Sequence, residues 1–308
     1  MQTTEAGTRQ FDVVIVGGGP AGLSAALMLG RARRSVLVID AGQPRNRAAA
    51  HMHGLLSRDG MSPLELLERG RLEASRYGVQ FAEGVVTGID RIDGGFRVHG
   101  PESISARRVV VATGLVDVLP DVPGVQQLWG TAAVVCPYCD GWEVRDQPLG
   151  VIATSPMSRN QAHLLRQWTS ELTVFGAAEA GIPEVELAGL RARGIRLAPA
   201  ALEVSGSLGE LEVRTGDGTH RVSRVFVGAR PRPSDALLTS LGCATLDTPA
   251  GPFVSTDPSG QTSVDGVWAI GNVADMKALV PISLGAGTHA ATQINISLLE
   301  EEIAKVVV

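Results

Sequence analysis

The glycine-rich stretch at residues 17–22, GGGPAG, constrains the fold of this chain more than any other feature. An apolar run typical of a strand precedes it at residues 11–16, and a helical pattern follows at residues 23–31. A second strand is expected at residues 35–39 and ends at Asp40. This order, with G-x-G-x-x-G in the first turn, is typical of a β-α-β unit. The sequence therefore predicts an α/β fold.

The glycines of this turn are suited to binding a dinucleotide. Gly17 permits the tight turn, Gly19 lets a pyrophosphate approach the backbone, and Gly22 allows close helix packing. The helix N-terminus adds free N–H groups and the positive end of its dipole. Asp40 stands where an acid can accept hydrogen bonds from ribose hydroxyls. We therefore expect a dinucleotide site, and the alternative is a Gly-rich turn in an ordinary α/β protein.

The remaining pattern predicts a second α/β unit. Its 308 residues suffice for about two domains of roughly 150 residues each. We expect two Rossmann-like nucleotide-binding domains, each a three-layer ββα arrangement. The expected strands are residues 79–81, 84–89, 96–99, 108–112, 150–153, 172–175, 202–204, 211–215, 224–227 and 267–270. The expected helices are residues 63–77, 160–170 and 182–193, and one that begins near residues 285–287 and continues past residue 299.

Charge and hydropathy exclude several kinds of partner. The net charge of −5 disfavours nucleic acid and anionic membranes, because both require a basic surface. The N-terminus lacks an apolar signal core, and no run reaches the ~18 apolar residues of a membrane span. We therefore expect a cytoplasmic protein that binds neither nucleic acid nor a membrane.

Cys136 and Cys139 are separated by two residues, in the sequence CPYCDG. Such a pair can close a disulfide ring, share a metal or exchange electrons with a neighbour. Structural zinc usually takes four nitrogen or sulfur ligands, and no second CxxC or CxxH is present. Cys243, the third cysteine, is expected to be a small buried hydrophobic residue. We therefore expect a redox pair and no metal.

The chain resembles the thioredoxin reductase-like flavoproteins over nearly its whole length. The resemblance rests on four motifs in the family's order: residues 17–22, Ala112-Thr113-Gly114, residues 136–141 and Gly271-Asn272. It implies FAD in a discontinuous domain, residues 1–117 with 245–308. It also implies an inserted NADPH-type domain, residues 118–244, that carries the redox pair. A homodimer is implied as well.

The resemblance also assigns cofactor contacts residue by residue. Asn272 departs from the family, which has aspartate there to bind the flavin ribityl chain, but an amide can also hydrogen-bond a hydroxyl. Ile282 is expected just before the closing helix, at the isoalloxazine edge. The expected set is Gly17, Gly19, Pro20, Ala21, Gly22, Asp40, Arg45, Asn46, His53, Val86, Thr113, Gly114, Gly271, Asn272 and Ile282.

The inserted domain lacks the features that a family member needs to bind NADPH. Residues 153–159 read ATSPMSR, with no glycine for a pyrophosphate, and Pro156 removes a donor N–H. Residues 176–179, GAAE, lack the Arg or Lys that a 2′-phosphate requires. We therefore expect this domain to keep its fold and to have lost its nucleotide.

Family members with this loss include dithiol oxidases similar to those that close the disulfides of gliotoxin and holomycin in natural product biosynthesis. The resemblance implies that a small-molecule dithiol is oxidised and that oxygen accepts the electrons, giving hydrogen peroxide. It makes Cys139 the flavin-proximal sulfur, Cys136 the sulfur that meets substrate and Asp140 the general acid/base. The alternatives are a thioredoxin reductase-type enzyme fed by NADPH or ferredoxin, and a flavin-bearing redox sensor.

Three further residues have two interpretations each. Tyr138 and Trp142 can form walls for a substrate, although aromatic residues more often lie in a core or an interface. His289 can line a substrate pocket, but a packed helix histidine is the more common case.

Overall fold

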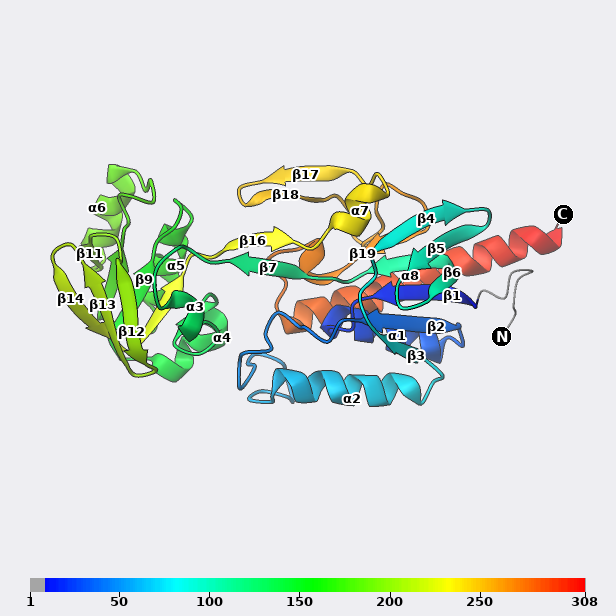
Figure 1. Cartoon of the computed structure of the whole chain (residues 1–308), viewed down its shortest axis with the longest axis horizontal. Helices are drawn as coiled ribbons and strands as arrows, with labels where there is room; N and C mark the ends of the chain where they lie inside the picture. The colour runs from blue at the N-terminus through cyan, green and yellow to red at the C-terminus, as the bar shows by residue number, and fades with distance from the viewer. Residues whose placement is uncertain (1–8, 308) are drawn as a thin grey trace. The chain divides into compact units, whose positions relative to one another are not determined.

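The computed structural model describes residues 9–307, which form two compact units (Figure 1). Unit 1 contains the described residues up to Arg45, Leu64–Val116 and the chain from Pro231 onward. Unit 2 contains Asn46–Pro63 and Asp117–Arg230. The chain passes between the units in two strands that pair with each other, β7 (Leu115–Val118) and β16 (Arg230–Pro233). The return to unit 1 thus precedes residue 245, the boundary that the resemblance implies.

Unit 1 is built on one sheet with strand order β3-β2-β1-β6-β5-β4, and β19 also pairs with β6. Strands β1, β2, β3, β6 and β19 run parallel, as the β-α-β pattern requires, while β4, β5 and β6 form an antiparallel meander. Its strands are β1 (Gln10–Val16), β2 (Val36–Asp40), β3 (Gln80–Glu83), β4 (Gly88–Ile92), β5 (Gly95–His99), β6 (Ser103–Val111), β17 (Thr245–Thr248), β18 (Gly251–Val254) and β19 (Val267–Ala269). Its helices are α1 (Pro20–Arg31), α2 (Pro63–Ser75), α7 (Ala236–Ser240), the 3-10 turn η2 (Gly271–Val273) and α8 (Val280–Val307).

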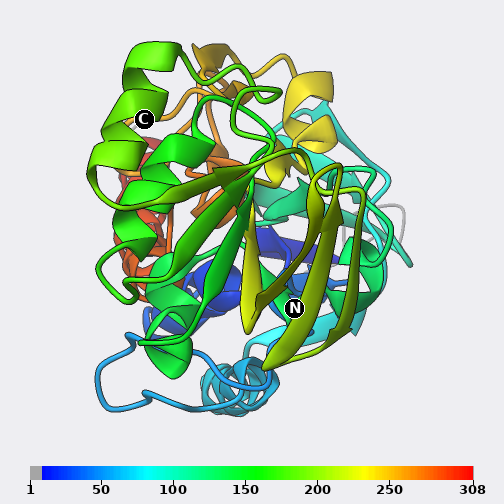
Figure 2. The same ribbon diagram turned by 90° about the vertical axis from the view of Figure 1, so that its left-hand side faces the viewer.

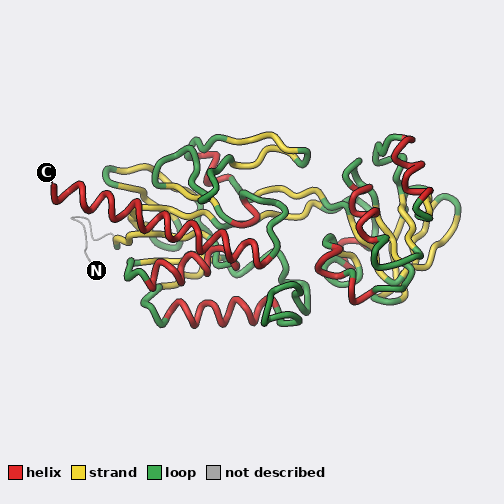
Figure 3. Tube along the Cα trace, turned by 180° about the vertical axis from the view of Figure 1, so that it is seen from behind, coloured by secondary structure: helices red, strands yellow, loops and turns green. Residues whose placement is uncertain are grey.

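Strand β1 is apolar on both faces because the sheet of unit 1 is covered on both sides. Val13 and Ile15 face a core made with α1 and α8, and Figure 3 shows α8 lying along α1. Val14 and Val16 face a second core that includes β4, β5 and α7. A strand buried on both faces reads as a continuous apolar run, which explains its sequence. The unit therefore has the expected three layers.

Unit 2 repeats this plan around a parallel sheet with strand order β11-β10-β9-β15-β8. Successive residues of β9 and β10 face opposite cores, one with the helices and one with the antiparallel sheet β12-β13-β14. Figure 2 shows the helices and the antiparallel strands on opposite sides. Its strands are β8 (Ala133–Val134), β9 (Leu149–Ile152), β10 (Leu172–Phe175), β11 (Arg196–Ala198), β12 (Glu203–Ser207), β13 (Glu210–Thr215), β14 (Gly218–Val222) and β15 (Arg224–Val227). Its helices are α3 (Val125–Leu128), α4 (Pro137–Asp140), the 3-10 turn η1 (Trp142–Val144), α5 (Ser158–Leu165) and α6 (Glu184–Ala192).

Several element boundaries differ from the sequence-based prediction. Strand β6 begins at Ser103, where a start at residue 108 was expected, and α5 ends at Leu165, where an end at residue 170 was expected. Two further differences concern the start of an element. A strand was expected at residues 84–89, but β4 begins at Gly88, because its tight connection to β5 pairs Ile92 with Gly95 and sets the register. The closing helix was expected near residue 285, but α8 begins at Val280. A proline in the first turn costs no helical hydrogen bond, so Pro281 is compatible with this start. Ile282 therefore lies inside the helix and not before it.

Across residues 9–307, no helix combines the length and the apolar character that crossing a membrane requires.

Candidate active site around the Cys136–Cys139 disulfide

Cys136 and Cys139 form a disulfide, which confirms that the pair can close a small ring. Their Cα atoms are 5.2 Å apart, and both residues are partly exposed. The pair follows β8, and Cys136 caps α4, whose first residue is Pro137. Proline suits this position because its fixed φ starts a helix. The backbone N–H of Cys139 donates to Sγ of Cys136 at 3.2 Å, so the helical turn holds the two sulfurs at the correct spacing.

Asp140 follows the pair and forms a partly buried ion pair with Arg224 of β15. Nη1 of Arg224 lies 3.2 Å from Oδ1 of Asp140, and it also donates to the carbonyl oxygen of Asp140 at 3.3 Å. Burial raises the pKa of the Asp140 carboxyl above its ordinary value, and the positive charge of Arg224 opposes this rise. The result is a carboxyl beside the disulfide with a raised pKa, suited to exchanging a proton.

A second pair of charges lies next to Asp140. Nε2 of His53 is 3.4 Å from Oε1 of Glu143, in η1, and its Nδ1 is 3.4 Å from Oδ2 of Asp59. Glu143 raises the pKa of Asp140, and His53 lowers it. The loop Asn46–Pro63 thus belongs to unit 2 and brings His53 to the redox pair. No three His, Cys, Asp or Glu side chains in residues 9–307 are grouped so as to hold a metal ion.

The two aromatic residues that flank Cys139 are exposed. Tyr138 is 65% exposed and Trp142 is 63% exposed. Tyr138 contacts the ring of Trp168 edge to face, and the guanidinium of Arg145 lies 4.1 Å from the centre of the Trp142 ring. The structure therefore puts neither side chain in a core, and both offer exposed apolar surface on residues close to the disulfide in sequence.

The dinucleotide turn of unit 1 has the close backbone approaches that its glycines permit. Gly17 has a φ of +106°, and a Cβ there would overlap the carbonyl of Ala112. A Cβ at Gly22 would overlap the carbonyl of Gly17. In contrast, a Cβ at Gly19 would meet open space, and Gly19 makes no side-chain cap at the N-terminus of α1. Pro20 and Ala21 begin the helix, so its first N–H groups face an open side.

The acid after β2 is already engaged within the protein. Oδ1 of Asp40 accepts a hydrogen bond from the backbone N–H of Gly18 at 3.0 Å, and Oδ2 accepts one from Arg71. Arg71 was not foreseen from the sequence, because it lies on α2 with no motif around it. Asp40 thus links the glycine turn to α2.

The C-terminal motif meets the first turn in unit 1. A Cβ at Gly271 would lie 2.9 Å from Cβ of Ala21, so the two stretches are in contact. Oδ1 of Asn272 accepts from Nη1 of Arg45 at 3.3 Å, and its Nδ2 donates to two carbonyls within its own loop. Gly271 and Ile282 also line a cavity of about 170 Å³. Five expected cofactor residues from distant parts of the chain, Ala21, Arg45, Gly271, Asn272 and Ile282, are therefore brought together.

The remaining expected cofactor residues have other surroundings. Oγ1 of Thr113 donates to the carbonyl of Ser234 at 2.7 Å, and Gly114 has a φ of +71°. Val86 packs in the core of unit 1. Asn46 and His53 belong to unit 2.

The corresponding turn of unit 2, after β9, is closed by its own side chains. Oγ of Ser158 accepts from the backbone N–H of Thr154 at 3.2 Å, and the Thr154 hydroxyl donates to the carbonyl of Gly228. Arg159, on the first turn of α5, is paired with Glu186. After β10, the carboxylate of Glu179 accepts from the N–H of Ala200 at 3.4 Å. At this turn, the N–H of Thr154 and the guanidinium of Arg159 are therefore already engaged within the protein.

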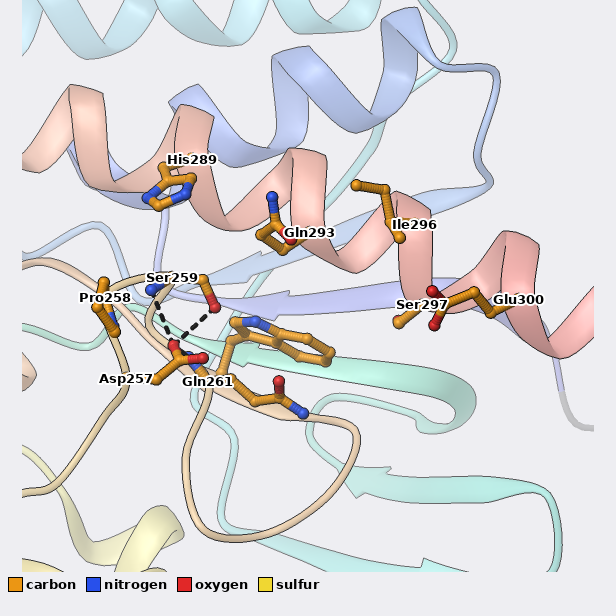
Figure 4. Close-up of a pocket in the computed structure, with 10 residues that line it drawn as sticks. Asp257, Pro258, Ser259, Gln261, His289, Gln293, Ile296, Ser297 and Glu300 are labelled. Carbon is orange, nitrogen blue, oxygen red and sulfur yellow. Dashed lines mark hydrogen bonds between the residues drawn. The ribbon is translucent and has the colours of Figure 1, made fainter.

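Unit 1 also has a cavity of about 410 Å³ beside α8 (Figure 4). His289, Gln293 and Glu300 line it from α8, and Asp257 and Gln261 line it from the facing loop. His289 was expected either to line a pocket or to pack within its helix, and it lines a pocket. No expected cofactor residue lines this cavity.

Arg224 and Glu143 were not foreseen from the sequence. Arg224 opens the buried run RVFV of β15, and an arginine at the start of an apolar strand is the one local signal that it has a buried partner. Glu143 is one of many acids, and nothing in its local sequence distinguishes it.

Comparison with known proteins agrees with this architecture. The sequence matches the family described as pyridine nucleotide-disulphide oxidoreductase over residues 11–293. It is 31% identical over 306 residues to "Thioredoxin reductase tcpT" of Claviceps purpurea (strain 20.1), covering 94% of this chain and 95% of that protein. It is 38% identical over 175 residues to a "Probable thioredoxin reductase" of Arthroderma benhamiae, covering 54% of this chain and 43% of that protein.

Among solved structures, the chain is similar to that titled "Crystal structure of HlmI". The TM-score is 0.91 with 44% sequence identity, and the match covers 99% of this chain and 97% of that one. The fold and the family expected from the four motifs are therefore confirmed. The chain belongs to the pyridine nucleotide-disulphide oxidoreductases, as a thioredoxin reductase-like thiol/disulfide oxidoreductase.

Proposed function

We propose that this protein is an FAD-dependent dithiol oxidase that closes a disulfide in a small-molecule dithiol and passes the electrons to oxygen. One observation carries the proposal: the unit that holds the Cys136–Cys139 disulfide also has a nucleotide turn closed by Ser158. A redox pair without a nicotinamide donor has to receive its electrons from elsewhere, and the substrate dithiol is the simplest source. The fold similarity to HlmI and the resemblance to the dithiol oxidases support the same direction of electron flow.

The residues of unit 1 fit FAD. The N-terminus of α1 is uncapped, and Gly19 leaves room for a pyrophosphate next to its N–H groups. Gly17, Pro20, Ala21 and Gly22 shape this cradle. The other residues proposed to hold the cofactor are Asp40, Arg45, Asn46, His53, Val86, Thr113, Gly114, Gly271, Asn272 and Ile282. Bound FAD would supply the two-electron acceptor that takes electrons from thiols and transfers them to oxygen, giving hydrogen peroxide.

Hydrogen bonding at the turn after β9 supports the proposed loss of NADPH binding in unit 2. A pyrophosphate is bound by free backbone N–H groups at a helix N-terminus. At the turn after β9, the N–H of Thr154 already has an acceptor in Ser158, and Pro156 has no N–H to offer. Binding there would require breaking these contacts without a basic side chain in residues 176–179 to compensate.

The proposed chemistry begins with disulfide exchange. A substrate thiolate attacks Sγ of Cys136, the Cys136–Cys139 bond breaks, and Cys139 leaves as a thiolate. The second substrate thiolate then attacks the substrate sulfur bound to Cys136, which closes the product disulfide and releases Cys136. Asp140 accepts a proton from the substrate and returns it to the pair. The substrate thus loses two electrons and two protons. The cysteine pair gains both electrons and one proton, which Cys136 takes from Asp140, while Cys139 stays a thiolate and the second proton passes to solvent.

Anaerobic mixing tests the direction of electron flow. The oxidised protein is mixed with a dithiol or with NADPH, and the flavin absorption band is followed. We expect rapid bleaching by the dithiol, reversal by air and release of hydrogen peroxide. Rapid bleaching by NADPH, or bleaching only by reduced ferredoxin, would instead support a thioredoxin reductase-type enzyme.

The assigned electron path predicts a specific loss. Cys139→Ser should retain FAD and the fold but lose dithiol turnover, because the flavin-proximal sulfur is gone. Retained turnover in this variant would contradict the path. The resemblance also supports a homodimer as the working assembly, which light scattering during gel filtration tests directly.

A further inference from the structure

Arg224 is a buried cation that the proposed chemistry does not yet use. Its side chain is 9% exposed, and it stands at the start of β15 among buried apolar residues. Nη1 contacts both the carboxyl and the carbonyl oxygen of Asp140. Its Nε has no hydrogen-bond partner within residues 9–307. The described polar contacts of the guanidinium therefore all go to one residue, Asp140, which follows Cys139.

Such an arrangement is not favoured by stability alone. Moving a guanidinium out of water costs several kcal/mol, and an apolar residue of similar volume is often as stable or more stable in its place. The unpartnered Nε adds to the cost. A buried charge of this kind is a candidate for a functional role, and its only described ion-pair partner is Asp140.

We propose that Arg224 is a positioning residue for the redox pair, which fixes the Asp140 carboxyl beside Cys139 and keeps it ionised so that it can accept the substrate proton. This inference rests on the proton role given to Asp140 in the proposed function. Contact with both the carboxyl and the carbonyl explains how one arginine can set both the position and the charge of Asp140.

The charges around Asp140 support this role. Three ionisable groups act on it from different elements: Arg224 on β15, Glu143 on η1 and His53 on the loop Asn46–Pro63. His53 and Glu143 face each other at 3.4 Å, and Asp59 faces His53 from the other side. The effects of His53 and Glu143 on the Asp140 carboxyl have opposite sign, so they offset each other. Arg224 is then the charge that opposes the effect of burial.

Direct titration of Asp140 provides the first test. Arg224→Met keeps an unbranched apolar stem and removes the charge, so the carboxyl should ionise about 1 to 3 pH units higher than in the wild type. The readout is the carbon-13 shift of the aspartate carboxyl, assigned with Asp140→Asn. Arg224→Gln keeps a donor in place of the guanidinium and should show the same upward shift, so it carries the test if Arg224→Met does not fold.

Kinetics of the disulfide alone provide the second test. The rate at which dithiothreitol reduces Cys136–Cys139 is measured without oxygen, by thiol labelling and mass spectrometry, across a pH series. In Arg224→Met, the pH at which the rate rises should be higher than in the wild type, by the same number of pH units as the titration of Asp140. Asp140→Asn should abolish that part of the profile, and adding Arg224→Met to it should cause no further displacement.

Arg221→Met is the matched control, because Arg221 lies on β14, carries the same charge and is 86% exposed. It should leave both the titration and the pH profile unchanged. An unchanged Asp140 titration in Arg224→Met, or a rate lowered equally at every pH, would overturn the inference and leave Arg224 with a structural role only. Neither readout depends on oxygen or NADPH, so bleaching of the flavin by NADPH would refute the oxidase while leaving this inference intact.

Discussion

The chemistry at the residue scale depends on the immediate neighbours of the cysteine pair. The ring itself is local, since Cys136 caps the turn that contains Cys139. The charge state of Asp140 depends on a residue that is distant in sequence, because its ion-pair partner Arg224 is 84 residues away. The disulfide therefore depends on the spacing of the two cysteines in the sequence. The proton chemistry beside it depends on the packing of β15, which carries Arg224.

Exposed aromatic surface beside the pair predicts a preference among dithiols. Trp142→Ala removes the ring that flanks Cys139, and an aromatic contact contributes about 0.5–1.5 kcal/mol. The value of kcat/KM for benzene-1,2-dimethanethiol should therefore fall about two- to tenfold. The value for dithiothreitol, which has no ring, should change little, and Trp142→Phe should retain most of the preference. Equal losses for both dithiols would contradict a role in substrate contact.

The ion pairs of Glu302, on α8, predict that the stability of the protein depends on pH. Its carboxylate accepts from Arg34 at 2.5 Å and from Arg107 at 2.7 Å, and these bonds lower its pKa from 4.5 to about 2. A lowered pKa in the folded state stabilises the protein above pH 4.5, and this stabilisation is lost as the pH falls towards 2. Glu302→Gln should therefore destabilise the protein at neutral pH, by about 1 kcal/mol because the pair is partly screened by solvent.

Urea unfolding at several pH values measures this effect. The difference between wild type and Glu302→Gln should shrink as the pH is lowered towards 2. Glu300→Gln removes the same charge from the exposed side of α8 and serves as the control. A difference that is constant with pH would show that the ion pairs are not its cause.

At the scale of elements, the turn after β1 in unit 1 and the turn after β9 in unit 2 occupy equivalent positions in their sheets but differ in their hydrogen bonding. Both follow a buried parallel strand and precede a helix. In unit 1, Gly19 leaves the N-terminus of α1 open. In unit 2, Ser158 accepts from the N–H of Thr154 at the turn after β9. The turn of unit 1 is therefore open beside Gly19, whereas the turn of unit 2 is partly bonded to its own side chains.

The packing of α8 on α1 predicts that replacing two nearby glycines of α8 by alanine changes the stability of the protein in opposite directions. A Cβ at Gly287 would overlap the carbonyl of Ala21, a backbone atom that cannot easily move, whereas a Cβ at Gly285 would meet open space. Gly287→Ala should therefore destabilise the protein by about 1–3 kcal/mol. Gly285→Ala should stabilise it by about 1 kcal/mol, through helix propensity. Urea unfolding measures both, and destabilisation of equal size would contradict the close approach.

At the scale of the whole molecule, the hydrogen bond that engages Thr154 at the turn after β9 in unit 2 predicts no response to NADPH. A ligand that binds the folded state stabilises it in proportion to the logarithm of its concentration. Millimolar NADPH should therefore leave the thermal unfolding midpoint unchanged, whereas an NADPH-dependent thioredoxin reductase run in parallel should be stabilised. A saturable increase in the midpoint would contradict the proposed loss of the nucleotide.

The sequence by itself determined the parts of this protein that depend on local spacing. The β-α-β unit, the three-layer fold class and the Cys136–Cys139 ring follow from patterns within a few residues of each other, and the structure confirms all three. Most strands were also predicted, because apolar runs bounded by turn residues read directly as buried strands.

Only the tertiary structure decided which distant residues meet. It joined Arg224 to Asp140, placed His53 in the unit of the redox pair and buried Val86 in a core. It also started α8 at Val280, where the glycines further along suggested a later start. The physical reason is that spacing fixes local geometry, whereas long-range contacts depend on how strands and helices pack, and packing leaves no periodic signal in one sequence.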